Sequence, residues 1–140
     1  MKKRLALISI VLVLVLICTI ALTACDNIKY AGTYEMISIS GYYTVNGQTT
    51  NLHKSMYEYY RIILKSSGVA VVESKPRFNG AAVEAKGKWK YEDGKILFKS
   101  KAGGFEIIEE LGYNDGVLTY KIEQIAEGIT MKVSIILKKA

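Results

Sequence analysis

Two Asp-Gly pairs, each between short runs of alternating apolar and polar residues, constrain the fold of this chain most strongly. Asp93-Gly94 and Asp115-Gly116 are typical of two-residue β-hairpin turns, because both turn positions need a positive φ that Asp and Gly tolerate. The first turn predicts Trp89 opposite Phe98, with lysines filling the other face. A slip of one residue would mix the two faces, so we expect this register in a half-buried antiparallel hairpin.

The second turn places Leu111 opposite Tyr120 and Glu110 opposite Lys121. The same register turns Glu109 toward the apolar face of the hairpin. An inward carboxylate needs a polar partner. We therefore expect Glu109 to contact a ligand, a buried Tyr or water at the mouth of the fold.

Further runs rich in Ile, Val, Tyr and Thr continue this pattern along the chain. A loop at Ser66-Ser67-Gly68 predicts a third hairpin that pairs Arg61 with Glu73. Eight strands suit a barrel or a sandwich, and sequential hairpins favour an all-β, eight-stranded antiparallel meander barrel. Such a barrel encloses side chains alone or one small ligand. The expected strands are Thr33–Ser40, Tyr57–Lys65, Val69–Lys75, Val83–Tyr91, Lys95–Lys101, Phe105–Tyr113, Val117–Glu123 and Ile129–Lys138.

The first 24 residues form a different kind of segment. Met1-Lys2-Lys3-Arg4 is basic and 5–17 is apolar apart from Ser9, which is typical of a secretory signal helix. The following Leu22-Thr23-Ala24-Cys25 resembles a bacterial lipobox. This resemblance implies cleavage between Ala24 and Cys25 and a lipid anchor on Cys25, with diacylglycerol and an acyl chain such as palmitate. The alternative is an uncleaved membrane anchor, and both place residues 26–140 outside the cytoplasmic membrane.

The chain therefore divides into a signal peptide (1–24), a lipidated Cys with a short tether (25–31) and a barrel domain (32–140). The net charge of +6 falls to +3 when the signal is removed, because three basic residues leave with it. This modest charge argues against nucleic-acid binding. With Cys18 lost and Cys25 modified, no disulfide can form, and the single His53 is expected on the surface. We expect no metal, no cofactor and no enzymatic activity, since no catalytic constellation is present.

Several segments of the barrel domain resemble lipocalin-like lipoproteins of Gram-positive bacteria. The resemblance is carried by Ala31-Gly32-Thr33-Tyr34-Glu35-Met36-Ile37-Ser38, Asn46-Gly47-Gln48, 51–57 and 87–96, with Tyr34 standing where the family has Trp. It implies a barrel with a ligand-sized interior and a short helix near 51–57. It also implies a lipid-anchored location on the extracytoplasmic face of the cell membrane of a Gram-positive host.

The leading functional hypothesis is non-catalytic binding of a small, mainly apolar ligand inside the barrel. The alternative is a protein-interaction or envelope module, such as an inhibitor of a wall-degrading enzyme, and an enzyme at the membrane surface ranks lowest. The same inward side chains could instead fill the barrel. Candidate lining residues are Tyr34, Tyr60, Ile62, Trp89, Phe98, Glu109, Tyr120, Met131 and Val133.

One hairpin carries an unusual number of lysines. The predicted register sets Lys88 opposite Lys99 and Lys86 opposite Lys101, which are unfavourable like-charge pairs. This face could contact anionic headgroups or an anionic envelope surface, or it could be a solvated face that prevents edge aggregation. The basic face comprises Lys86, Lys88, Lys90, Lys95, Lys99 and Lys101.

Overall fold

The computed structural model describes residues 27–78, 80–102 and 105–140, so the expected signal peptide, Ala24 and Cys25 lie outside the described residues. Within these ranges it shows helical residues at 27–30, nine strands and one short 3-10 helix, η1 (Lys54–Met56). The strands are β1 (Gly32–Val45), β2 (Gln48–Asn51), β3 (Tyr57–Leu64), β4 (Val69–Pro76), β5 (Val83–Glu92), β6 (Lys95–Ala102), β7 (Phe105–Asn114), β8 (Val117–Ala126) and β9 (Ile129–Lys139).

Eight of these strands form the predicted closed antiparallel barrel. The strands pair in the order β1, β3, β4, β5, β6, β7, β8, β9, and β9 pairs with β1 to close the ring. The expected short helix near 51–57 is present as η1. The ninth strand, β2, was not predicted, because its sequence Gln-Thr-Thr-Asn has no apolar alternation. It pairs with the end of β1 through a turn at Asn46 and Gly47.

The Asp-Gly turns adopt the predicted conformation. The φ angle is 50° at Asp93 and 46° at Asp115, and it is 79° at the Gly that follows each of them. Positive φ at both central residues is the hairpin turn that matches strand twist. The predicted registers are confirmed by the pairs Trp89–Phe98, Lys88–Lys99, Leu111–Tyr120 and Arg61–Glu73.

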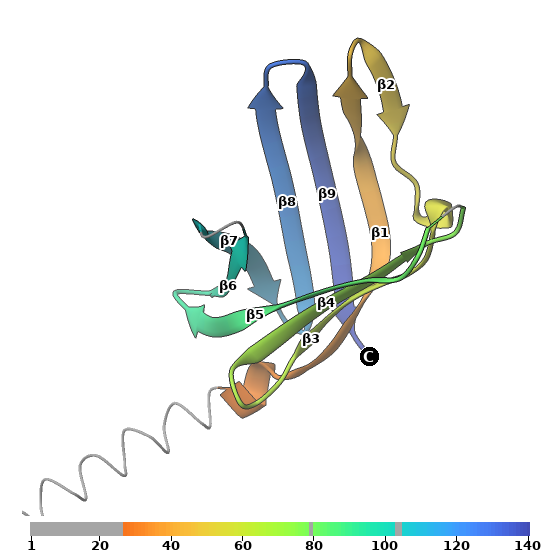
Figure 1. The fold of residues 1–140 in the computed structure, drawn as a ribbon. Coiled ribbons are helices and arrows are strands. Elements are labelled where there is room, and N and C mark those ends of the chain that lie inside the picture. Colours follow the sequence, from red (N-terminus) through yellow and green to blue (C-terminus); the bar gives the residue numbers. More distant parts are fainter. Residues whose placement is uncertain (1–26, 79, 103–104) are drawn as a thin grey trace, which may run out of the picture.

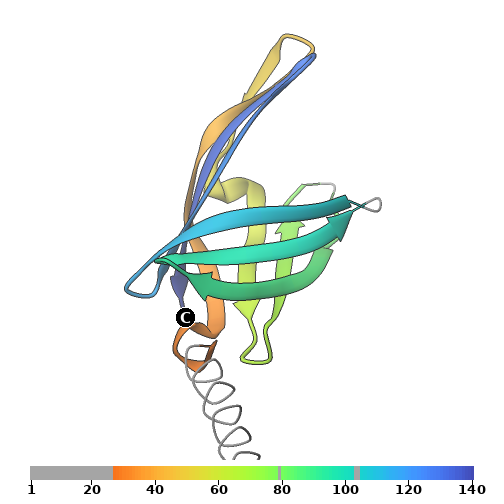
Figure 2. The same ribbon diagram turned by 90° about the vertical axis from the view of Figure 1, so that its left-hand side faces the viewer.

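The barrel is closed at one end and divided at the other. The β7–β8 ladder stops at Leu111–Tyr120, and the β1–β3 ladder stops at Glu35–Arg61. Beyond these points residues 40–51, 121–126 and 129–134 continue as a separate sheet, which we call the arm. The arm projects well past the other strands in both views (Figures 1 and 2).

This division overturns one predicted contact. Glu110 was expected opposite Lys121, but the β7–β8 ladder has already ended at that level. Glu110 instead accepts a hydrogen bond from Lys95 Nζ at 3.0 Å, across the β6–β7 ladder. The turn therefore specifies which residues pair, whereas the length of the ladder depends on how β7 and β8 pair with their other neighbours, β6 and β9.

A β-bulge in β1 lets that strand follow the curvature of the barrel. The register with β9 shifts between Met36 and Ser38, which leaves Ile37 as an extra residue that is 47% exposed. Tyr34, Met36 and Ile39 consequently all face the core despite their uneven spacing. Bulges bend a strand and increase its local twist, which a closing barrel needs.

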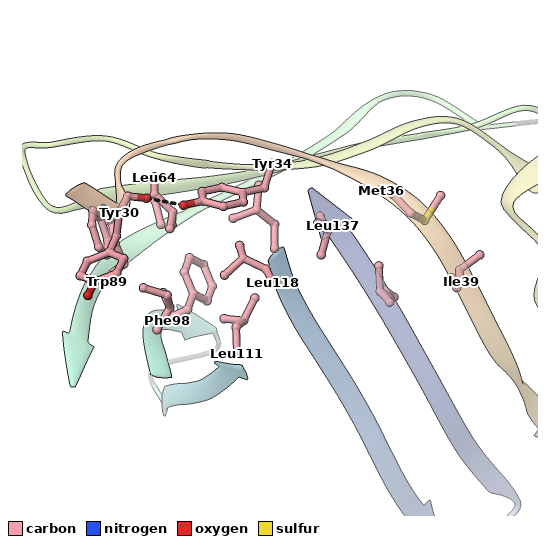
Figure 3. Close-up of a cluster of buried hydrophobic side chains, with 14 of the residues drawn as sticks. Tyr30, Tyr34, Met36, Ile39, Leu64, Trp89, Phe98, Leu111, Leu118 and Leu137 are labelled. Carbon is pink, nitrogen blue, oxygen red and sulfur yellow. Dashed lines mark hydrogen bonds between the residues drawn. The ribbon is translucent and has the colours of Figure 1, made fainter. Parts of the chain in front are cut away.

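The closed end is sealed by an aromatic cluster that includes residues before β1. Residues 27–30, assigned to the tether on sequence, are helical, and Tyr30 is only 6% exposed. Its ring stacks on Tyr91 with centroids 4.0 Å apart and meets Tyr113 edge-on at 4.8 Å. The Tyr34 hydroxyl donates to the Tyr30 carbonyl at 2.6 Å (Figure 3). Tyr30 thus closes the barrel floor from outside the strands.

Candidate functional site

The barrel interior holds a cavity of about 200 Å³. Five of the nine lining residues expected from sequence are brought together around it: Tyr60, Ile62, Phe98, Glu109 and Tyr120. They come from β3, β6, β7 and β8, so the cavity depends on the closure of the sheet into a barrel. No single hairpin could form it.

The cavity has an apolar floor. Ile62 and Leu64 on β3, Phe98 on β6 and Leu111 on β7 line its lower part, and each is at most 5% exposed. Figure 3 shows Leu64, Phe98 and Leu111 within the buried cluster, close to Leu118. Such a floor favours the apolar part of a molecule, because burial there removes apolar surface from water.

Polar side chains line the part of the cavity next to this apolar floor. Tyr120 belongs to the last β7–β8 pair, and Glu109 lies on β7 two residues beyond that pair. The Tyr120 hydroxyl donates to Glu109 Oε1 at 2.5 Å. The expected inward orientation of Glu109 is therefore present, with a Tyr as its partner. Tyr60 lines the same part of the cavity from β3.

The pKa values of these phenols reflect their surroundings. Burial, together with the smaller effect of the Glu109 charge, raises the pKa of Tyr60 to about 12. Burial also raises the pKa of Tyr120, helped by its hydrogen bond to Glu109, because ionisation would place a phenolate beside a carboxylate. Both phenols therefore remain neutral hydrogen-bond donors at physiological pH.

We expect the free energy of unfolding to fall as pH rises from about 10 to about 12. Burial raises the pKa of Tyr34 and of Tyr60 to about 12 in the folded protein, so this state keeps protons that the unfolded chain releases near pH 10. The stabilisation that these two phenols contribute is fully present below about pH 10, and it is lost as the pH rises through their pKa in the folded protein. Urea denaturation between pH 9 and 12 measures this decline in the free energy of unfolding. A Tyr60→Phe variant should show a shallower decline, and an unchanged slope would contradict this account.

The other four expected lining residues lie outside the cavity wall. Tyr34 is fully buried beneath Tyr30, and the Trp89 indole donates to the Lys65 carbonyl at 2.8 Å. Both act as core residues with satisfied polar groups. Met131 and Val133 lie on β9, where Val133 is buried and Met131 packs against the same core. The sequence could not distinguish cavity-lining residues from core residues, because both kinds of side chain point inward.

Five lining residues were missed by the sequence reasoning. Leu64, Val72 and Leu111 face inward in the predicted hairpins but were not assigned to the site. Ala85 and Ser100 also line the cavity. Their positions follow from alternation, since Ala85 lies four residues before Trp89 and Ser100 lies two residues after Phe98. Small side chains at these inward positions leave space, which was the available signal.

The cavity opens sideways where β7 and β8 separate. A cleft of about 390 Å³ lies between these strands, and Glu109 and Tyr120 line both the cleft and the cavity. Ile122 continues the apolar lining of the cleft onto the arm. The Glu109–Tyr120 pair therefore lies where the cavity and the cleft adjoin.

The basic face has both paired and unpaired lysines. Lys86, Lys90 and Lys95 form ion pairs of 3.2, 2.7 and 3.0 Å with Glu84, Glu92 and Glu110. Within the described residues no ion pair involves Lys88, Lys99 or Lys101, although these three line a depression of about 400 Å³ together with Lys86. The predicted Lys88–Lys99 pair is present, whereas Lys86 and Lys101 do not pair because the β5–β6 ladder ends at Lys88–Lys99.

Other features of the described residues bear on function less directly. His53 is exposed and immediately precedes η1. The described part of the chain contains no group of three or more His, Cys, Asp or Glu side chains placed to hold a metal ion. Over the same residues, no helix has the length and apolar character needed to cross a membrane. No protein-family model, curated protein or solved structure matches this chain.

Proposed function

We propose that this protein binds a small, mainly apolar ligand in its barrel without catalysing a reaction. The observation that carries the proposal is the cavity itself, with an apolar floor of Ile62, Leu64 and Leu111 and a few polar groups at its opening. Ligand sites generally combine apolar walls with a small number of placed polar groups. The similarity of several segments to lipocalin-like lipoproteins supports the same reading.

The size of the cavity limits the ligand. Its volume of about 200 Å³ is below the roughly 300 Å³ at which drug-sized sites begin. At ~30 Å³ per small non-hydrogen group, the volume of a water molecule in the liquid, it holds a body of about six or seven such groups. A longer ligand would have to leave through the cleft between β7 and β8.

We further propose that the protein is a lipoprotein anchored through Cys25 on the outer face of the cell membrane. Only four residues separate Cys25 from Tyr30, which seals the closed end of the barrel. This short connection would hold the closed end toward the lipid and leave the arm pointing away from it. Two acyl chains would make the attachment stable.

Native mass spectrometry of protein purified from its host tests the binding proposal. We expect a discrete added mass on the wild-type protein. Ala85→Trp should abolish it, because Ala85 lines the cavity and an indole there would occupy the space. The neighbouring Glu84→Trp is the matched control, since alternation places Glu84 on the opposite face of β5.

The two variants separate cavity binding from surface binding. Loss of the added mass in Ala85→Trp, with its retention in Glu84→Trp, would support the proposal. An absence of added mass on the wild type, or its equal retention in both variants, would contradict binding inside the barrel. Circular dichroism of each variant checks that the barrel remains folded.

A further inference from the structure

Glu109 lies at the cavity opening with only one of its two carboxylate oxygens in a hydrogen bond to the described residues. Its Oε1 accepts the Tyr120 hydroxyl at 2.5 Å. Its Oε2 accepts no hydrogen bond from the described residues, and it is not among the buried atoms. One oxygen is therefore held in place by the protein while the other is open to whatever enters. A half-fixed carboxylate of this kind is pre-organised to receive a hydrogen-bond donor.

Among the described residues no cation neutralises this carboxylate. The cavity wall contains no Lys, Arg or His, and no ion pair involving Glu109 is present. Lys121 lines the outer cleft, but its neighbour Tyr120 is the inward residue, so Lys121 belongs to the opposite face of β8. Glu110, the next residue along β7, is paired with Lys95 on the outside. Glu109 thus gives the cavity opening a negative charge that no cation of the described residues pairs with.

The surroundings of Glu109 define the shape of a matching ligand. The apolar floor lies on one side of the carboxylate, with Phe98 directly opposite Glu109 in the β6–β7 ladder and Leu111 below it. The cleft between β7 and β8 lies on the other side. A bound molecule would therefore place an apolar tail on the floor and a polar head beside Glu109, where the head keeps contact with water. A charged head left partly in water avoids most of the cost of burial.

We propose that the ligand is a cationic amphiphile, with a short apolar tail in the cavity and a protonated amine bound to the Glu109 carboxylate. This inference rests on the proposed binding function and adds the ligand's charge. An ammonium group supplies three donors and a positive charge, and charge-assisted hydrogen bonds are about twice as strong as neutral ones. The Tyr120 and Tyr60 hydroxyl oxygens can accept further hydrogen bonds from the same head.

Three six-carbon probes that differ only in their head group test this charge selection. Hexylamine, 1-hexanol and hexanoate are titrated at pH 7 into the full-length protein, and the dissociation constants are measured by saturation-transfer NMR. We expect hexylamine to bind about tenfold or more tightly than 1-hexanol, which corresponds to ~1.4 kcal/mol or more. Hexanoate should bind most weakly, because its carboxylate would face Glu109.

Substitutions at two adjacent residues then test whether Glu109 is the source of the preference for the amine. Glu109→Gln removes the charge but keeps an oxygen that can accept from Tyr120, so it should weaken hexylamine about tenfold and leave 1-hexanol unchanged. Glu110→Gln is the matched control, because it removes an equal charge from the outer face, and it should change neither probe.

The outcomes distinguish this inference from the function on which it rests. If none of the three probes binds the wild-type protein, the proposed apolar binding itself fails. If 1-hexanol binds as tightly as hexylamine, or if Glu109→Gln leaves hexylamine binding intact, the binding function stands and the amine preference is overturned. The comparison of probes on wild-type protein needs no variant, so it holds even if Glu109→Gln folds poorly.

Discussion

Replacing Gly41 by alanine is expected to lower the free energy of unfolding by about 3 kcal/mol or more. Gly41 adopts a φ of 116°, which L-residues rarely take, and a Cβ added there would overlap the carbonyl oxygen of Lys132. Lys132 belongs to β9, and the Gly41–Val133 pair lies where the β1–β9 ladder continues from the barrel into the arm. Backbone atoms cannot move aside as a flexible side chain can. The variant should therefore lose pairing between β1 and β9 at the base of the arm.

Gly112→Ala provides the matched control for this prediction. Gly112 lies in β7 without a positive φ, and an added Cβ would meet only Thr119 at an ordinary distance of 3.8 Å. This substitution should change stability by less than ~1 kcal/mol, and it could raise it by restricting the unfolded chain. Urea denaturation followed by circular dichroism measures both. Equal effects of the two substitutions would show that the contact with β9 does not limit stability.

Truncation of the single tryptophan is the second large expected effect. Trp89→Ala should cost about 3 to 5 kcal/mol, because Trp89 is 4% exposed and its removal leaves a large cavity at the closed end. Trp89 also ties down the β3–β4 turn, since its indole donates to the Lys65 carbonyl and its backbone N–H donates to the Gly68 carbonyl. The variant should therefore show faster amide exchange in that turn as well as lower stability.

Trp89→Phe separates the hydrogen bond from the packing. It keeps an aromatic ring opposite Phe98 but loses the indole donor. The Lys65 carbonyl can then be hydrated, because Lys65 is exposed, so the loss of this hydrogen bond should cost only about 1 kcal/mol. Equilibrium unfolding gives both values, and a Trp89→Ala cost as small as that of Trp89→Phe would contradict a packing role.

The hairpins were predictable because the signals that form them are local. Each Asp-Gly pair specifies a turn, and the turn together with side-chain alternation specifies which residues face one another. Trp89–Phe98 and Leu111–Tyr120 follow from that information alone and are confirmed. The inward orientation of Glu109 followed from the same register, including its need for a polar partner.

The residues that depart from simple alternation were not predictable in the same way. The bulge at Ile37 serves the curvature of the closed sheet, and no local signal in β1 marks it. The polar strand β2 exists because β1 offers it a free edge. Tyr30 was assigned to a tether, yet it packs in the core, because only the assembled barrel presents Tyr91 and Tyr113 to its ring.

Sequence by itself therefore determined the strands, the turns and the face on which each strand residue lies, since these depend on neighbours in the chain. Only the tertiary structure decided where the ladders end. β7 pairs with β8 as far as Leu111–Tyr120 and then separates, because β7 continues along β6 while β8 follows β9 into the arm. That separation opens the cavity beside Glu109, and it results from the balance of pairings around the whole ring, which no single hairpin contains.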